Sequence, residues 1–195
     1  MRTIKILTIL LLYSLSVAFG QESEKYLKLK SKRNYHEGYI INLDSVKVKG
    51  LVKANINKEE ERQYSMVEFF GVDGSETRYR PYDLKGYGYA TENFVSDYGS
   101  FYKVILSGKR AGVYVKLISY GRGGGGMVPQ TGYSQRNLYV VKNGKSDFRY
   151  VTRKGFKEEF SQYFGDCEKL KLKIQSEQVT SKDVELVVRE YNDCQ

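Results

Sequence analysis

The sequence predicts an α+β fold: an antiparallel β-sandwich or partly open barrel of about eight to ten strands, followed by two or three C-terminal helices. Most of the chain alternates apolar and polar residues between turn signals such as Asp73-Gly74 and Asn143-Gly144, as β-hairpins do. After Arg153, apolar residues recur at helical spacing instead. The 18 tyrosines favour strands, and with only two prolines the chain is not expected to contain long linkers.

The start of the chain predicts a secretory signal peptide. Residues 1–5 are positive, residues 6–17 form an uncharged and mainly apolar run, and Ala18 and Gly20 place small residues where a signal peptidase cleaves. The apolar run is shorter than the about 20 residues that span a bilayer. We therefore expect removal of residues 1–20 and an exported, soluble chain, periplasmic or secreted, without a transmembrane segment.

A β-rich body is expected over residues 21–153. Its charged start at residues 21–33 has no clear period and predicts a leader arm or a first edge strand. Residues 38–42 and 46–56 predict two strands around a turn at 43–45. The second strand alternates polar residues with apolar ones expected to face the core, which are Val46, Val48, Val52, Ala54 and Ile56.

Turn signals divide the rest of the body into further strands. Asp73-Gly74 predicts a hairpin, and Pro81 ends its second strand because proline cannot donate to a strand ladder. The glycine-rich residues 121–126 predict a flexible connection, and Asn143-Gly144 predicts a second hairpin. We expect strands over residues 64–70, 76–80, 87–92, 101–107, 111–120, 137–142 and 145–151.

Residues 154–195 are expected to form a helical segment packed on the same domain. Apolar spacing predicts helices over residues 156–164 and 168–174, although the second also shows a strand-like alternation. A last helix begins at a capping Thr180 or Ser181. Its apolar stripe consists of Val184, Val187, Val188 and Tyr191.

Two cysteines, Cys167 and Cys194, predict a structural disulfide. An even number of cysteines in an exported chain is typical of disulfide pairing. The alternative is a redox or metal pair, but the sequence has no C-x-x-C motif, and His36 is its only histidine. We therefore predict no metal site and no cofactor.

The mature chain is basic and suits an anionic partner. Arg2 and Lys5 lie in the expected signal peptide, so 30 of the 32 basic residues remain against 23 acidic ones, a net charge of +7. Phosphorylated lipids, anionic glycans and acidic proteins fit this charge, and a solvated surface rich in lysine is the alternative. Lys47, Lys49 and Lys53 form a basic stripe that either meets such a partner or protects a strand from aggregation. Without an arginine-rich arm, an exported chain is not expected to bind nucleic acid.

Residues 79–89 are the most unusual segment, because tyrosines, cations and glycines alternate within eleven residues. Tyrosine offers a flat apolar face with a polar tip, and arginine and lysine bind anions. The alternative is a strand corner whose tyrosines half-bury against the sheet. The predicted ligand-binding residues are Tyr79, Arg80, Tyr82, Lys85, Tyr87 and Tyr89.

No catalytic residues are predicted. A nucleophile–histidine–acid triad would have to use His36, which lies in a polar arm. A glycosidase-like pair of carboxylates, such as Asp83 and Glu92, would have to converge in a cleft, and sequence spacing does not place them.

Four motifs resemble those of an uncharacterised family of exported bacterial β-rich proteins. They are the hairpin at residues 38–52, the segment at 79–89, Asp166-Cys167, and Tyr191-Asn192-Asp193-Cys194. The resemblance implies an exported, β-rich protein with a C-terminal helical segment and a cysteine pair, and it assigns no activity or catalytic residue.

These observations favour a non-catalytic binding or interaction module of the bacterial cell envelope, whose partner is an envelope component or a protein, such as an anionic one. A structural or assembly protein with an open sheet edge is the first alternative, and a carboxylate-based hydrolase is the second.

Overall fold

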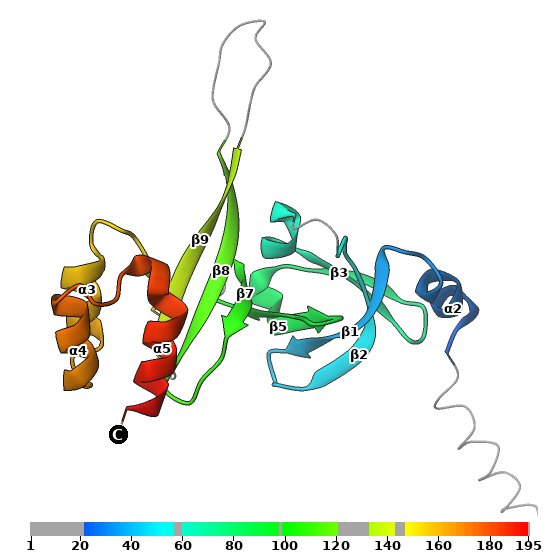
Figure 1. The fold of residues 1–195 in the computed structure, drawn as a ribbon. Helices are drawn as coiled ribbons and strands as arrows, with labels where there is room; N and C mark the ends of the chain where they lie inside the picture. Colours follow the sequence, from blue (N-terminus) through cyan, green and yellow to red (C-terminus); the bar gives the residue numbers. More distant parts are fainter. Residues whose placement is uncertain (1–21, 57–59, 98, 121–132, 143–146, 195) are drawn as a thin grey trace, which may run out of the picture.

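The computed structural model describes residues 22–56, 60–97, 99–120, 133–142 and 147–194. Within them, ten antiparallel strands form one sheet, ordered β10-β9-β8-β7-β6-β5-β1-β2-β3-β4. The sheet does not close into a barrel, and helices follow it (Figure 1), so the predicted α+β class is confirmed. The expected signal peptide, the glycine-rich segment and Asn143-Gly144 lie outside the described residues.

Most strands pair in the sheet with the strand that precedes or follows them in the chain. Every adjacent pair in the sheet joins consecutive strands except β5 and β1. The strands are β1 Tyr35–Asn42, β2 Lys47–Lys53, β3 Val67–Gly71, β4 Glu76–Tyr79, β5 Leu84–Tyr89, β6 Glu92–Ser96, β7 Phe101–Leu106, β8 Ala111–Tyr120, β9 Tyr133–Lys142 and β10 Arg149–Tyr150.

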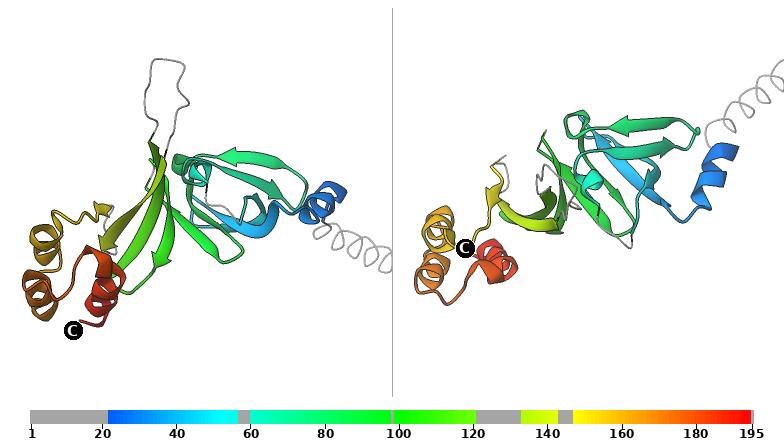
Figure 2. Two further views of the ribbon diagram at one scale, coloured as in Figure 1. Left: turned by 45° about the horizontal axis from the view of Figure 1, so that its top comes forward. Right: turned by 90° about the horizontal axis from the view of Figure 1, so that it is seen from above.

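Helices lie at the two ends of the sheet. Three C-terminal helices lie beside β8 and β9, whereas one N-terminal helix lies beside β1 and β2 (Figures 1 and 2). The α-helices are α2 Glu24–Lys30, α3 Phe156–Tyr163, α4 Glu168–Gln175 and α5 Val184–Asp193. The 3-10 helices are η1 Glu61–Tyr64, η2 Pro81–Asp83 and η3 Ser181–Asp183.

The curved sheet carries two main cores. In the first, the C-terminal helices pack on β8 and β9, and the predicted stripe of α5 is buried. In the second, apolar side chains of β1, β2, β3, β5, β6, β7 and β8 gather around the buried Tyr64 of η1, which packs on β7 and β8. Strand β8 belongs to both, because Val113 lies in the first core and Leu117 in the second. The sheet is therefore continuous across two separate apolar clusters.

The expected arm or edge strand at residues 21–33 is instead the helix α2. Ser23 caps it by accepting a hydrogen bond from the Tyr26 amide at 3.1 Å. Tyr26 and Leu29, three residues apart, bury one face of this short helix against the sheet. Seven residues are too few to reveal a helical period among so many charges.

The predicted burial of β2 is correct only in part. Val52 and Ala54 are buried, but so is Leu51, because α2 covers the opposite face of the sheet. Val46 and Val48 are 54% and 40% exposed, since β3 pairs with β2 only from Gly50 to Val52. Ile56, beyond the end of β2, is 57% exposed.

The expected strand at residues 87–92 is instead a hairpin. Strand β5 ends at Tyr89, β6 begins at Glu92, and these two residues pair across the turn. Ala90 adopts a φ of 47°, a left-handed conformation that usually requires glycine or asparagine. The turn was missed because Ala90-Thr91 lacks those signals.

Candidate functional site

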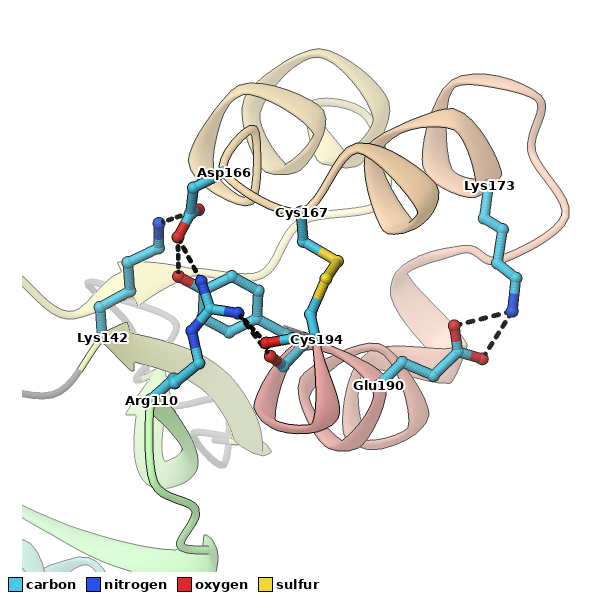
Figure 3. Close-up of a disulfide and its surroundings, with 8 residues drawn as sticks. Arg110, Lys142, Asp166, Cys167, Lys173, Glu190 and Cys194 are labelled. Carbon is cyan, nitrogen blue, oxygen red and sulfur yellow. Dashed lines mark hydrogen bonds and ion pairs between the residues drawn. A yellow bond between two sulfur atoms is a disulfide. The ribbon is translucent and has the colours of Figure 1, made fainter.

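The predicted disulfide is present and joins the ends of two helices. Cys167 precedes α4 and Cys194 follows α5, with their Cα atoms 6.1 Å apart. Beside it, Asp166 accepts hydrogen bonds from Lys142 Nζ at 2.8 Å and Tyr191 Oη at 2.6 Å (Figure 3). Arg110 donates to the same carboxylate. This cluster ties the helices to the sheet.

The charges around Asp166 keep it ionised. Partial burial opposes ionisation, but the hydrogen bonds from Lys142 and Tyr191 outweigh it and lower the pKa of Asp166 to about 2. Arg110 also stacks on the Tyr191 ring, 4.0 Å from its centroid, and donates to the carbonyls of Tyr191 and Cys194. The cations here are occupied by structural partners.

Asn192 completes this attachment. Its Oδ1 accepts from the amides of Arg110 and Ala111 at 2.7 and 3.0 Å, and its Nδ2 donates to the Ala111 carbonyl at 3.0 Å. The side-chain amide of Asn192 thus makes hydrogen bonds to the backbone at the start of β8, as the backbone of a neighbouring strand would. The motifs Asp166-Cys167 and Tyr191-Asn192-Asp193-Cys194 therefore have a structural role.

The six residues predicted to bind a ligand do not share one groove. Tyr87 and Tyr89 lie in the core at 1% and 3% exposure. Tyr87 Oη donates to the Gln63 carbonyl at 2.6 Å, and Gln63 Nε2 donates to Tyr89 Oη. Tyr79 is half-buried against Phe69. Tyr87 and Tyr89 therefore fix η1 to the core and are more deeply buried than the alternative of half-buried tyrosines expected, whereas Tyr79 fits that alternative.

The other three predicted residues are exposed at one end of the sheet. Arg80 Nη1 donates to Tyr82 Oη at 2.9 Å, and Tyr82 is 50% exposed. Lys85 Nζ donates at 2.6 Å to Ser45 Oγ in the β1–β2 turn. They can contact a partner in solvent without Tyr87 or Tyr89.

A different cluster surrounds Glu68 on β3. Its side chain is only 3% exposed, yet three cations from different elements reach it. Lys53 Nζ lies 3.0 Å and Arg78 Nε 3.1 Å from its oxygens, and Arg62 from η1 makes the third ion pair. Burial alone would raise the pKa of Glu68, but Lys53 and Arg62 lower it below its usual value. Glu68 is thus ionised, and its negative charge holds three cations in place.

A cavity of about 550 Å³ opens beside this cluster. We call it the Glu68 pocket and define it by Arg33, Lys53, Ile56, Arg62, Gln63 and Glu68, which line it. The side chains of Lys53 and Arg62 remain 37% and 50% exposed, so both can bind a second anion from solvent. Arg33 lies where β1 begins and has no ion pair among the described residues. The pocket offers three cations, one of which Glu68 does not engage, and two carboxylates, Glu60 and Glu68.

Catalysis by His36 or by the pair Asp83 and Glu92, and metal binding, have less support than anion binding. His36 Nε2 donates to the Ala54 carbonyl at 3.1 Å, and its ring stacks near Tyr89. Asp83 accepts from the Arg80 amide at 2.8 Å, and Glu92 pairs with Lys103. In the part of the chain that the structure describes, no group of three or more His, Cys, Asp or Glu side chains could hold a metal.

Sequence reasoning missed the Glu68 pocket. Its signal was a lone glutamate among apolar neighbours in Val67–Gly71, which indicates a buried charge that needs partners. The partners Lys53, Arg62 and Arg78 come from three other elements, so their meeting depends on the sheet register and on η1.

Comparisons with protein-family models, with curated proteins and with solved structures each found no match. The resemblance to exported bacterial proteins therefore stays a prediction. Among the described residues, no helix combines the length and the apolar character needed to cross a bilayer.

Proposed function

We propose that this protein is a non-catalytic, exported binding module of the cell envelope, and that it binds an oxyanion group in the Glu68 pocket. The observation that carries the proposal is that one buried carboxylate, Glu68, holds Lys53 and Arg62 at the lining of a cavity that Arg33 also lines. A carboxylate or phosphate group would complete the hydrogen bonds of Arg33, Lys53 and Arg62.

Export is supported by the disulfide, because such bonds persist in oxidising compartments. A binding role is favoured over hydrolysis by the state of Glu68. Its lowered pKa keeps it ionised near neutral pH, whereas a general acid must hold a proton there. Its oxygens are also occupied by Lys53, Arg62 and Arg78, so it positions cations and does not face a substrate.

Calorimetric titration at low salt tests the proposal with inorganic phosphate, glucuronate and glucose as probes. The two anions are expected to bind and the neutral sugar is not. Arg33→Ala should weaken anion binding about fivefold or more, because one charge-assisted hydrogen bond is lost. It should leave thermal stability unchanged, since Arg33 has no ion pair among the described residues.

Arg153→Ala is the matched control, an exposed arginine between β10 and α3 that does not line the Glu68 pocket. Equal affinity for glucose and glucuronate would reject an oxyanion site. Unchanged anion affinity in both Arg33→Ala and Lys53→Ala would reject this pocket as its location.

A further inference from the structure

We propose that the tip of the β1–β2 hairpin binds the surface of a bilayer that contains anionic phospholipids. The hairpin tip is defined here by four exposed apolar or aromatic side chains and by four cations beside them. The apolar group is Leu43, Val46, Val48 and Tyr82, and the cations are Lys47, Lys49, Arg80 and Lys85. The proposal goes beyond the anion site in the Glu68 pocket and does not rest on it.

The apolar side chains are exposed because of the sheet geometry. β3 pairs with β2 only from Gly50 onward, so the first residues of β2 extend past their neighbour. Leu43, Val46 and Val48 are 47%, 54% and 40% exposed within one hairpin. A cluster of apolar side chains at a protruding end marks an interaction surface more often than isolated exposed residues do.

The turn holds these side chains in a fixed arrangement. Asn42 Oδ1 accepts from the Val46 amide at 2.8 Å, and the Asn42 amide donates to the Val46 carbonyl at 3.1 Å. Ser45 takes the left-handed position of the turn with a φ of 66°. Little conformational entropy is therefore left to lose when the tip meets a partner.

The strand register brings the exposed part of residues 79–89 to the same end. Leu84 pairs with Asn42, so η2 and Tyr82 lie next to the β1–β2 turn. Lys85 bonds Ser45 directly. Tyrosine is favoured at the boundary between lipid and water, because its ring is apolar and its hydroxyl is polar.

The charges at the tip select an anionic surface. Its four cations outnumber its two carboxylates, Asp44 and Asp83, and Asp83 already accepts from the Arg80 amide. The Lys47 ammonium lies 3.6 Å from the centroid of the Tyr39 ring, which holds it on the opposite face of the strand from Val46 and Val48. Apolar side chains flanked by lysines fit an interface whose interior is hydrocarbon and whose surface is phosphate.

Co-sedimentation with lipid vesicles tests the proposal on the full mature chain. Vesicles of equimolar phosphatidylglycerol and phosphatidylcholine should bind the protein, and pure phosphatidylcholine should bind it at least tenfold more weakly. The double variant Leu43→Asn, Val46→Asn should lose about tenfold or more, because two apolar contacts with lipid disappear. Lys47→Ala with Lys49→Ala should lose about tenfold or more, because each cation near the surface contributes about fivefold.

Matched controls separate the tip from general surface effects. Leu172→Asn removes an apolar side chain that is 55% exposed on α4, and Lys169→Ala removes an exposed lysine from the same helix. Neither should change vesicle binding. Circular dichroism melting confirms that all variants fold.

Three outcomes would overturn the proposal: no binding to either vesicle, equal binding to both, or loss in the lysine variant alone, which would indicate charge attraction without insertion. The Glu68 pocket is tested separately. Arg33→Ala should bind vesicles normally, and the Leu43 and Val46 variant should bind glucuronate normally.

Discussion

At the scale of single residues, two carboxylates, Glu68 and Asp166, each hold a cluster of cations. Glu68 collects Lys53, Arg62 and Arg78 on one side of the molecule, and Asp166 collects Arg110 and Lys142 on the other. Both have lowered pKa values, so both contribute stability only while they are ionised.

The pKa of Asp166 predicts a loss of stability in acid. Its folded pKa of about 2 lies below its unfolded value, so its contribution is complete above about pH 4 and disappears as the pH falls to about 2. The side chain is 48% exposed, so after solvent screening we expect about 1 kcal/mol. The contribution is measured by urea unfolding of the native protein and of the Asp166→Asn variant between pH 2 and 6, which gives the free energy of unfolding of each. Equal pH slopes for the two proteins over this range would contradict the prediction.

Sequence reasoning identified single residues when their chemistry is local. The cysteine pair followed from the predicted export and an even count, and the stripe of α5 followed from spacing. Glu68 could not be assigned, because the identity of its partners depends on contacts between distant elements. Tyr87 and Tyr89 were expected in a binding surface, but the register of β5 turns them toward the core.

At the scale of elements, turn chemistry decided which hairpins the sequence predicted. Asp73-Gly74 gave the β3–β4 hairpin correctly, and Gly74 has the expected positive φ of 85°. The β1–β2 turn was also predicted, at residues 43–45, and its left-handed residue is Ser45. The β5–β6 turn was not predicted, because its left-handed residue is Ala90, which carries no recognisable turn signal. Helix α2 was also not predicted from the sequence. Its two buried residues form an apolar face only through their contacts with Leu51 and Phe70, which are distant in the chain.

The strained turn of the β5–β6 hairpin can be relieved. Ala90→Gly should raise the free energy of unfolding by about 0.5–1 kcal/mol, because glycine removes a left-handed Cβ penalty that exceeds its added entropy when unfolded. Thermal unfolding measures the change. Ala54→Gly, at a buried position without a positive φ, should instead destabilise the protein. A lower melting temperature for Ala90→Gly would show that the turn carries no relievable strain.

At the scale of the whole molecule, the sequence predicted the class and order of elements but not their curvature. Alternation distinguishes a strand from a helix, yet it does not tell whether one sheet curls or two sheets face each other. The curl depends on the twist and on irregular pairings such as those in the β1–β5 and β7–β8 ladders. The separation into two cores follows from that curl.

The two cores should respond differently to reduction. Cys167–Cys194 constrains only the helical core, where a loop of 27 residues corresponds to about 3–4 kcal/mol. Under a reducing agent, amides of α3, α4 and α5 should exchange hydrogen faster, while amides of β1, β2 and β5 keep their protection. Hydrogen exchange with mass spectrometry measures both. Uniform loss of protection would mean that the cores unfold as one unit.

The order of strands in the sheet also bears on how the chain assembles. Consecutive strands pair throughout β1–β4 and throughout β5–β10, so each run can form from local contacts. Among the ladders of the described residues, only the β1–β5 pairing, where Ile40 meets Tyr87, joins the two runs, and it spans the longest stretch of chain. Loop-closure entropy therefore makes this pairing the least favourable one to form first, and the native topology is complete only when it closes.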